Sequence, residues 1–163
     1  ACRMAAGLQR RFGFEKLRMF DAHVWRQLQD EARAQVCEPR AAVYGSDLAF
    51  RMVDFAKRNA ERAGVVSAIE LRGGDALQRM PPTDVSGVML VNPPYGERIG
   101  DRDALEPLYT DLGRMVKERC SGWDFWLLSG NPELTGALRM KASRRIPVSN
   151  GGIDCRWLHY AVR

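Results

Sequence analysis

Stretches with one apolar face at helical spacing alternate along this chain with short, mostly apolar runs. The helical stretches follow Asp21, Leu48 and Asp103. The apolar runs are bounded by turn residues, as is typical of buried strands in a parallel sheet, and they cover residues 41–45, 65–71, 87–91 and 123–128. This alternation predicts an α/β fold with a mostly parallel sheet.

The C-terminal pattern differs and predicts an antiparallel hairpin. Residues 144–148 and 153–162 are strand-like, and Asn150-Gly151-Gly152 between them is a turn signal. Lys141, Arg144 and Arg145 form a small basic cluster at its start. This cluster has two interpretations, either a contact for RNA or a guard against pairing at the edge strand.

Composition narrows the class of protein. The 163 residues suffice for one domain, 1–163, and 45% apolar with 28% charged residues is typical of a globular protein. The net charge of +5 favours a polyanionic partner. Four cysteines without Cys-x-x-Cys spacing indicate reduced thiols and a cytoplasmic location. Two histidines make a histidine-based metal site improbable, and no apolar run reaches the roughly 20 residues of a membrane span.

The stretch from Gly87 to Gly100 carries the candidate chemistry. An apolar run ends abruptly at Asn92-Pro93-Pro94-Tyr95, because proline cannot donate to a strand ladder. Asn92 is therefore expected at the carboxyl end of a strand, where open α/β sheets bind ligands. The Asn92 amide oxygen and the Pro93 carbonyl offer two acceptors for an aryl amine, and Tyr95 offers a face for stacking a base. The alternative is a tight loop in which Asn92 merely caps a turn.

These motifs resemble a known family. Asn92-Pro93-Pro94-Tyr95 is similar to motif IV of the S-adenosylmethionine-dependent amino-methyltransferases. Its extension to Gly100, together with 44–47 and 150–155, resembles the large-subunit (23S) ribosomal RNA guanine-N2 methyltransferases that carry a THUMP domain. The resemblance implies a Rossmann-like class I methyltransferase fold and methyl transfer to the N2 amine of a guanine in 23S ribosomal RNA. Pro94 would stiffen the loop.

The same resemblance implies S-adenosyl-L-methionine as cofactor, bound through Asp47, Leu48, Asp75, Ala76 and Asn92. Asp47 follows the second strand, where an acid accepts hydrogen bonds from ribose hydroxyls; its alternative role is a helix N-cap. Asp75 follows two glycines and matches the family position that accepts from the adenine amino group. Its alternative is a simple Gly-Asp turn.

One family feature is missing from the sequence. Members carry a first strand and a glycine-rich loop beside the methionine moiety, and this chain has no such string. We therefore expect a fragment whose first strand is absent, inactive alone, with the upstream part of the same polypeptide needed to complete the cofactor site. The sheet is expected to close over the gap or to be completed by a neighbouring chain.

Several alternatives stay open. An adenine-N6 DNA methyltransferase would use the same four-residue motif, and a non-catalytic RNA-binding remnant would keep the fold alone. Glu97 and Arg98 either pair with each other or, for Arg98, meet RNA phosphate. The basic and aromatic segment 1–20 either contacts RNA or the active site, or packs Phe12 and Phe14 into the core. Ser129 lacks the Gly-x-Ser-x-Gly elbow, which excludes a hydrolase nucleophile of that type.

Overall fold

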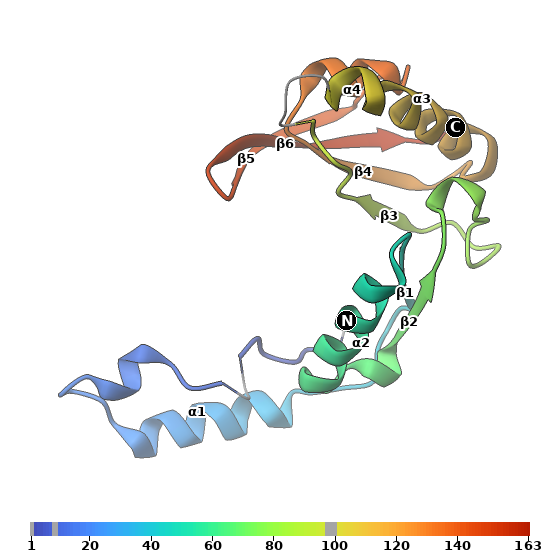
Figure 1. Ribbon diagram of the computed structural model, residues 1–163. Coiled ribbons are helices and arrows are strands. Elements are labelled where there is room, and N and C mark those ends of the chain that lie inside the picture. Colours follow the sequence, from blue (N-terminus) through green and yellow to red (C-terminus); the bar gives the residue numbers. More distant parts are fainter. Residues whose placement is uncertain (1, 8–9, 97–100) are drawn as a thin grey trace. The chain divides into compact units, whose positions relative to one another are not determined.

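The computed structural model describes residues 2–7, 10–96 and 101–163, and these form two compact units, Ala1–Ala76 and Leu77–Arg163. Figure 1 shows helices and strands in both units. A short 3-10 turn, η3 (Ala76–Gln78), lies where one unit gives way to the other in the sequence. Each unit is described by itself.

The first unit contains a parallel pair of strands with a helix between them in the sequence. β1 (Val43–Asp47) pairs with β2 (Ile69–Gly73), so that Asp47 lies opposite Gly73. α2 (Phe50–Arg62) connects them through a short 3-10 turn, η2 (Val66–Ala68). The prediction of a strand from 65 was wrong for its first residues. The N–H groups of Val65 and Ala68 bond the carbonyls of Ala60 and Val65, and these local bonds replace ladder bonds.

α1 (Ala22–Ala34) begins as predicted after Asp21, and the segment that precedes this helix in the sequence folds back on it. The Asp21 carboxylate accepts from the backbone N–H groups of the first turn, which is N-capping. The Trp25 ring contacts the rings of Phe12 and Phe14, with centroids 5.7 and 5.0 Å away. A 3-10 turn, η1 (Gly13–Lys16), lies within this aromatic segment. No residue of α1 itself is buried.

The second unit is a four-stranded sheet with two helices packed on one side (Figure 1). The strand order is β3-β4-β6-β5, in which β3 (Val88–Val91) runs parallel to β4 (Asp124–Ser129). β6 (Ile153–Ala161) is antiparallel to both β4 and β5 (Arg144–Asn150), as the predicted hairpin requires. The helices are α3 (Asp101–Arg119) and α4 (Pro132–Ala137).

The core of the second unit lies between the sheet and these helices. Phe125 on β4 stacks on Tyr160 on β6 with ring centroids 5.6 Å apart, and both side chains are fully buried. From α3, the predicted inward residues Leu112, Met115 and Val116 pack against them. The Arg119 guanidinium at the end of α3 donates to the carbonyls of residues 77 and 79 at 2.9 and 3.2 Å. The start of the unit is thereby fixed to the helix.

In the part of the chain that the structure describes, strand pairing forms one sheet in each unit, β1-β2 in the first and β3-β4-β6-β5 in the second. That the sheet closes over a gap, or is completed by a neighbouring chain, stays a prediction. None of the described helices is both long enough and apolar enough to cross a membrane.

Candidate functional site

The loop that follows β3 begins at the carboxyl end of the strand, as predicted. The strand ends at Val91, and Asn92 comes next with an exposed side chain. Pro93 is buried and Pro94 is exposed, while Tyr95 is half-buried. The buried side chain of Pro93 packs into the second unit, and the exposed amide of Asn92 is accessible to a ligand.

Two side chains from distant segments support the backbone of this loop. The Tyr109 hydroxyl on α3 donates to the Pro94 carbonyl at 3.0 Å, and the Asn131 amide donates to the Tyr95 carbonyl at 3.3 Å. Burial raises the pKa of Tyr109 to about 12, with a smaller contribution from the neighbouring Tyr95. The Tyr109 hydroxyl therefore keeps its proton at neutral pH and remains a donor.

Asn131 has a second role, which fixes its orientation. Its side-chain oxygen accepts from the N–H groups of Glu133 and Leu134 at 3.0 and 3.2 Å, and so caps α4. With the oxygen used in this way, the amide group faces the loop after β3. One side chain thus joins the start of α4 to the candidate site.

The half-buried Tyr95 side chain lies next to the end of β4 and to the hairpin. Its hydroxyl donates to the amide oxygen of Asn92 and accepts from the Asn150 amide at 3.4 Å. A Cβ atom placed on Gly130 would lie 3.1 Å from the Tyr95 ring and 3.4 Å from the sulfur of Cys155. The chain after β4 thus lies so close to the ring that a larger residue than glycine would require the ring to move by a few tenths of an ångström.

The loop leaves acceptors available for a ligand. The carbonyls of Pro94 and Tyr95 are used by Tyr109 and Asn131, but among the described residues no donor contacts the carbonyl of Pro93. The Asn92 oxygen accepts from Tyr95 and has a second lone pair. These two acceptors, adjacent in sequence, are the pair that the sequence predicted for an aryl amine.

The other predicted residues lie in the first unit, at the carboxyl ends of β1 and β2. The Asp47 carboxylate is exposed and accepts from the N–H of Ala49 at 2.8 Å, while the Asp47 carbonyl accepts from Gly74 at 2.9 Å. The N-cap of α2 is Ala49, so Asp47 forms a turn before the helix rather than the cap. Gly74 has φ +135°, which favours glycine, and the half-buried Asp75 follows it.

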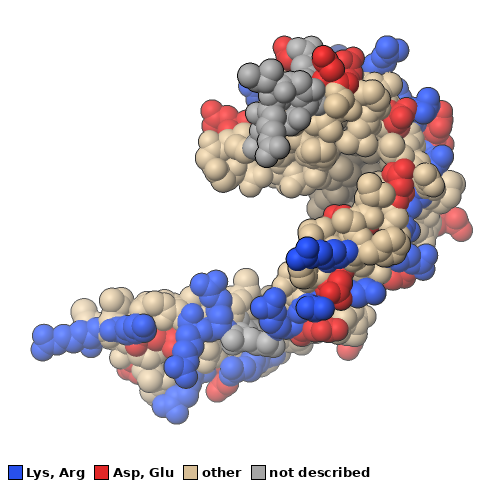
Figure 2. All heavy atoms as spheres, in the orientation of Figure 1, with Lys and Arg blue, Asp and Glu red and all other residues tan. Residues whose placement is uncertain are grey.

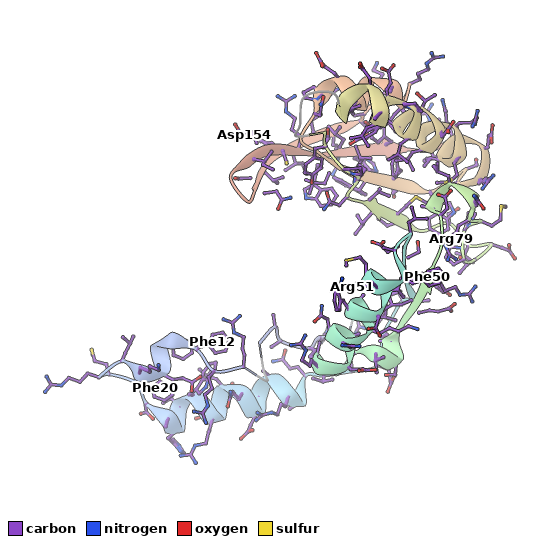
Figure 3. The ribbon with its side chains drawn as sticks, in the orientation of Figure 1. Phe12, Phe20, Phe50, Arg51, Arg79 and Asp154 are labelled. Atoms are coloured by element: carbon purple, nitrogen blue, oxygen red, sulfur yellow. The ribbon has the colours of Figure 1, made fainter. Side chains whose placement is uncertain are left out.

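Apolar side chains lie at this same end of the first unit. Leu48 is 72% exposed, and the Phe50 ring, marked in Figure 3, lies directly over Gly73, whose added Cβ would be 2.4 Å from it. Ala76 is exposed at the start of η3. Asp47 and Asp75 thus both follow the carboxyl ends of the paired strands β1 and β2, at the end of the unit where these exposed apolar side chains lie. Figure 2 shows Lys and Arg gathered over α1 and the segment before it.

The sequence did not predict some residues of the candidate site, and other predicted residues lie outside the described residues. Tyr109 was expected only as part of the helix that follows Asp103, and Asn131 was not singled out. Asn150 was named as part of the hairpin turn and of a matching string, and Cys155 as part of that string. Glu97 and Arg98, with the motif extension to residue 100, lie outside the described residues. In the described ranges, no three His, Cys, Asp or Glu side chains gather as a metal site would need.

Comparison with known proteins identifies the family of the chain. Residues 1–159 match the family described as UPF0020, RMKL-like, methyltransferase domain. The "Ribosomal RNA large subunit methyltransferase K/L" of Shewanella baltica (strain OS185) is 41% identical over an alignment 169 positions long, which covers 99% of this chain and 23% of that protein. The chain therefore spans about a quarter of the length of the curated relatives it matches.

Solved structures show the same fold. A crystal structure titled "a possible methylase from Clostridium difficile 630" superposes with a TM-score of 0.89 at 32% identity, covering 99% of this chain and 43% of that chain. The protein SMU.472, crystallised in complex with SAH, gives a TM-score of 0.88 at 24% identity over the same shares; at that identity the likeness concerns the fold alone. The chain belongs to the RMKL-like methyltransferase domain family (UPF0020), and its fold is the Rossmann-like fold of class I methyltransferases.

Proposed function

We propose that this chain is the part of a ribosomal RNA methyltransferase that holds the target base, and that the reaction is methyl transfer to the exocyclic N2 amine of a guanine in 23S ribosomal RNA. The relatives are named as methyltransferases of the large-subunit RNA. The observation that carries the proposal is the loop after β3, in which the Asn92 oxygen and the Pro93 carbonyl remain available while neighbouring carbonyls are bound by Tyr109 and Asn131.

The loop's contribution is alignment. Two fixed acceptors hold both hydrogens of an aryl amine, which localises the nitrogen lone pair and directs it away from the base. The Tyr95 ring supports the base by stacking. Because displacement at a methyl group depends mainly on the line of approach, holding the nitrogen in place supplies much of the rate. The amine loses its proton after attack, so no strong general base is required.

The first unit offers residues suited to S-adenosylmethionine, which when bound supplies an electrophilic sulfonium methyl. We assign the ribose hydroxyls to the exposed carboxylate of Asp47 and the adenine amino group to Asp75. Leu48 and Ala76 would contact the adenine ring, and Asn92 is the further residue that we assign to cofactor binding. The exposed apolar side chains and the glycine turn before Asp75 fit such a group. That the 163-residue chain alone binds this cofactor poorly stays a prediction, which calorimetry tests.

The decisive experiment replaces Asn92 by alanine in the intact protein that carries this chain. Methylation of large-subunit RNA with labelled S-adenosylmethionine is expected to fall about 10²-fold or more, because the amine loses one of its two fixed acceptors. Asn59→Ala, an exposed asparagine on α2, is the matched control and should methylate normally. Unchanged methylation by the Asn92 variant, with its fold intact by circular dichroism, would end the proposal.

Product analysis separates guanine-N2 transfer from its nearest rival. The same two acceptors would hold the N6 amine of adenine, so the intact protein should be offered both large-subunit RNA and duplex DNA. Mass spectrometry of the digested nucleosides is expected to show N2-methylguanosine from the RNA. N6-methyladenine from the DNA would point to the rival reaction instead. Absence of any methylated product would leave the non-catalytic RNA-binding module.

A further inference from the structure

The second unit contains a cavity that the reaction described above does not use. Its volume is about 940 Å³, within the range of sites that hold small ligands. α4 forms one wall through Pro132 and Thr135, and the β5–β6 hairpin forms the other. The opposite walls come from segments of one packed unit, so the cavity does not depend on how the two units are arranged.

The cavity adjoins the residue proposed to stack on the target base. Gly130 and Cys155 line it, and a Cβ placed on Gly130 would meet both the Tyr95 ring and the Cys155 sulfur. Asn150, which donates to the Tyr95 hydroxyl, lies at the end of β5 beside the cavity residue Ser149. An RNA strand whose target base stacks on Tyr95 therefore passes the mouth of this cavity with the adjacent nucleotide.

Two arginines line the cavity from the same face of the hairpin. Arg145 pairs with Leu158 and Arg156 pairs with Pro147, so the two arginines are diagonal neighbours across the strands. The Cα atoms of such a diagonal pair lie about 7–8 Å apart. Within the described part of the chain neither forms an ion pair. Two guanidinium groups at this spacing, without a carboxylate partner, suit a phosphate.

Charge across this region favours an anion. Residues 139–163 carry six Lys and Arg side chains and one carboxylate, Asp154. Asp154, labelled in Figure 3 at the hairpin, lines the same cavity. It pairs with Ser149 in the ladder, toward the turn and away from Arg145. Arg145 also lies close enough to the Tyr160 hydroxyl at the cavity wall for its charge to oppose the rise in the pKa of Tyr160 caused by burial.

We propose that this cavity binds the nucleotide adjacent to the target guanine in single-stranded RNA, with its phosphate between Arg145 and Arg156. The proposal rests on the proposed function, because it takes Tyr95 as the platform for the target base. The cavity would fix the register of the RNA strand so that one base reaches Asn92. It is a positioning site that makes no contact with the reacting atoms.

The test compares charge removal inside the cavity with charge removal beside it. Arg145→Gln and Arg156→Gln remove the cavity arginines, and Arg144→Gln removes the preceding residue, which pairs with His159 and lies on the opposite face. All three arginines are exposed, so the substitutions should preserve the fold. The probe is a short fluorescent single-stranded RNA titrated with the intact protein over a range of salt concentrations.

Each cavity variant is expected to weaken RNA binding several-fold and to reduce the slope of log K against log salt by about 0.7, which corresponds to one phosphate contact on a single strand. The double variant should lose no more of the slope, because both arginines hold the same phosphate. Arg144→Gln should leave the slope unchanged. An equal loss in the Arg144 variant would overturn the proposal, as would wild-type binding by both cavity variants.

Failure of this proposal is separable from failure of the proposed function. Wild-type RNA binding and methylation by both cavity variants, with Asn92→Ala inactive, would remove the cavity site and keep the reaction. Loss of RNA affinity in the cavity variants of a protein that methylates no RNA would keep the site and remove the reaction.

Discussion

The two units differ most in how many side chains they bury. Of the seventeen buried apolar residues in the described structure, only Val53 and Ala60 belong to the first unit, and the other fifteen belong to the second. Large apolar side chains such as Leu48 and Phe50 are instead more than 70% exposed in the first unit. The loop after β3 therefore rests on a packed core, whereas the proposed cofactor residues lie on turns with little core beneath them.

This difference explains how each candidate site is held. In the second unit, Pro93 is buried and its neighbours are bonded by side chains from α3 and from the start of α4. In the first unit, the Asp47 and Gly74 turns are held by backbone bonds at the ends of β1 and β2. Rigid positioning of the acceptors is thus a property of the core of the second unit, and disturbing that core should disturb the loop.

The largest effect should come from the core itself. Phe125→Ala removes a fully buried ring that stacks on Tyr160, and the expected loss is about 3–5 kcal/mol of unfolding free energy. Phe50→Ala in the first unit removes a ring of the same size that is 76% exposed, and should cost about 1 kcal/mol or less. Urea denaturation followed by fluorescence measures both changes. Equal losses in the two variants would refute the contrast between the units.

A pair of glycines tests how closely the helices of the second unit pack. A Cβ on Gly113 of α3 would lie 2.3 Å from the backbone oxygen of Leu138, whereas a Cβ on Gly136 of α4 would meet nothing within 4 Å. Gly113→Ala should therefore cost about 3 kcal/mol through overpacking. Gly136→Ala should be neutral or stabilise by up to about 1 kcal/mol, because alanine favours a helix.

Thermal unfolding followed by circular dichroism distinguishes the two glycine variants. The expected result is a lowered midpoint for Gly113→Ala only. If Gly113→Ala melted like the wild type, the contact between α3 and the segment after α4 would be looser than the structure shows. The proposed RNA methylation should fall in the same variant, since α3 also carries Tyr109.

Local features of the second unit were predictable because short-range sequence patterns determine them. The two prolines after 87–91 ended β3 where expected, and Asn150-Gly151-Gly152 produced the hairpin turn. The supports of the loop were not predictable, because Tyr109 and Asn131 contact it across 15 and 36 residues of sequence. Such contacts depend on how α3 and α4 pack, which helical periodicity does not specify.

The first unit shows a different limit. Val65 to Ile69 has the apolar composition of a strand, yet η2 occupies its start because the left-handed Gly64 turns the chain into local bonds. Aspartate is a residue type that favours the N-cap position, yet Ala49 rather than Asp47 is the N-cap of α2. In both places local backbone geometry, which composition does not specify, distinguishes between two conformations that the residue types allow.

The smallest effect concerns alkaline pH and belongs to the second unit. Burial raises the pKa of both Tyr109 and Tyr160 from 10.0 to about 12. In the unfolded chain these phenols ionise near pH 10, so the unfolded state loses its protons first as the pH rises. Their contribution is therefore fully present below pH 10 and is lost progressively toward pH 12. By pH 11, one pH unit above the pKa of the unfolded chain, the expected loss is about 1.4 kcal/mol for each tyrosine.

Urea denaturation at pH 8, 10 and 11 should show this loss, and two variants assign it. Tyr109→Phe should reduce the alkaline loss and also lower stability by about 1 kcal/mol at pH 8, because its hydrogen bond to the Pro94 carbonyl disappears. Tyr160→Phe should reduce the alkaline loss alone, since Tyr160 makes no such bond among the described residues. A free energy of unfolding that stays constant from pH 8 to pH 11 would mean that water reaches both hydroxyls. The hydrogen bond from Tyr109 to the loop after β3 would then not be shielded from water.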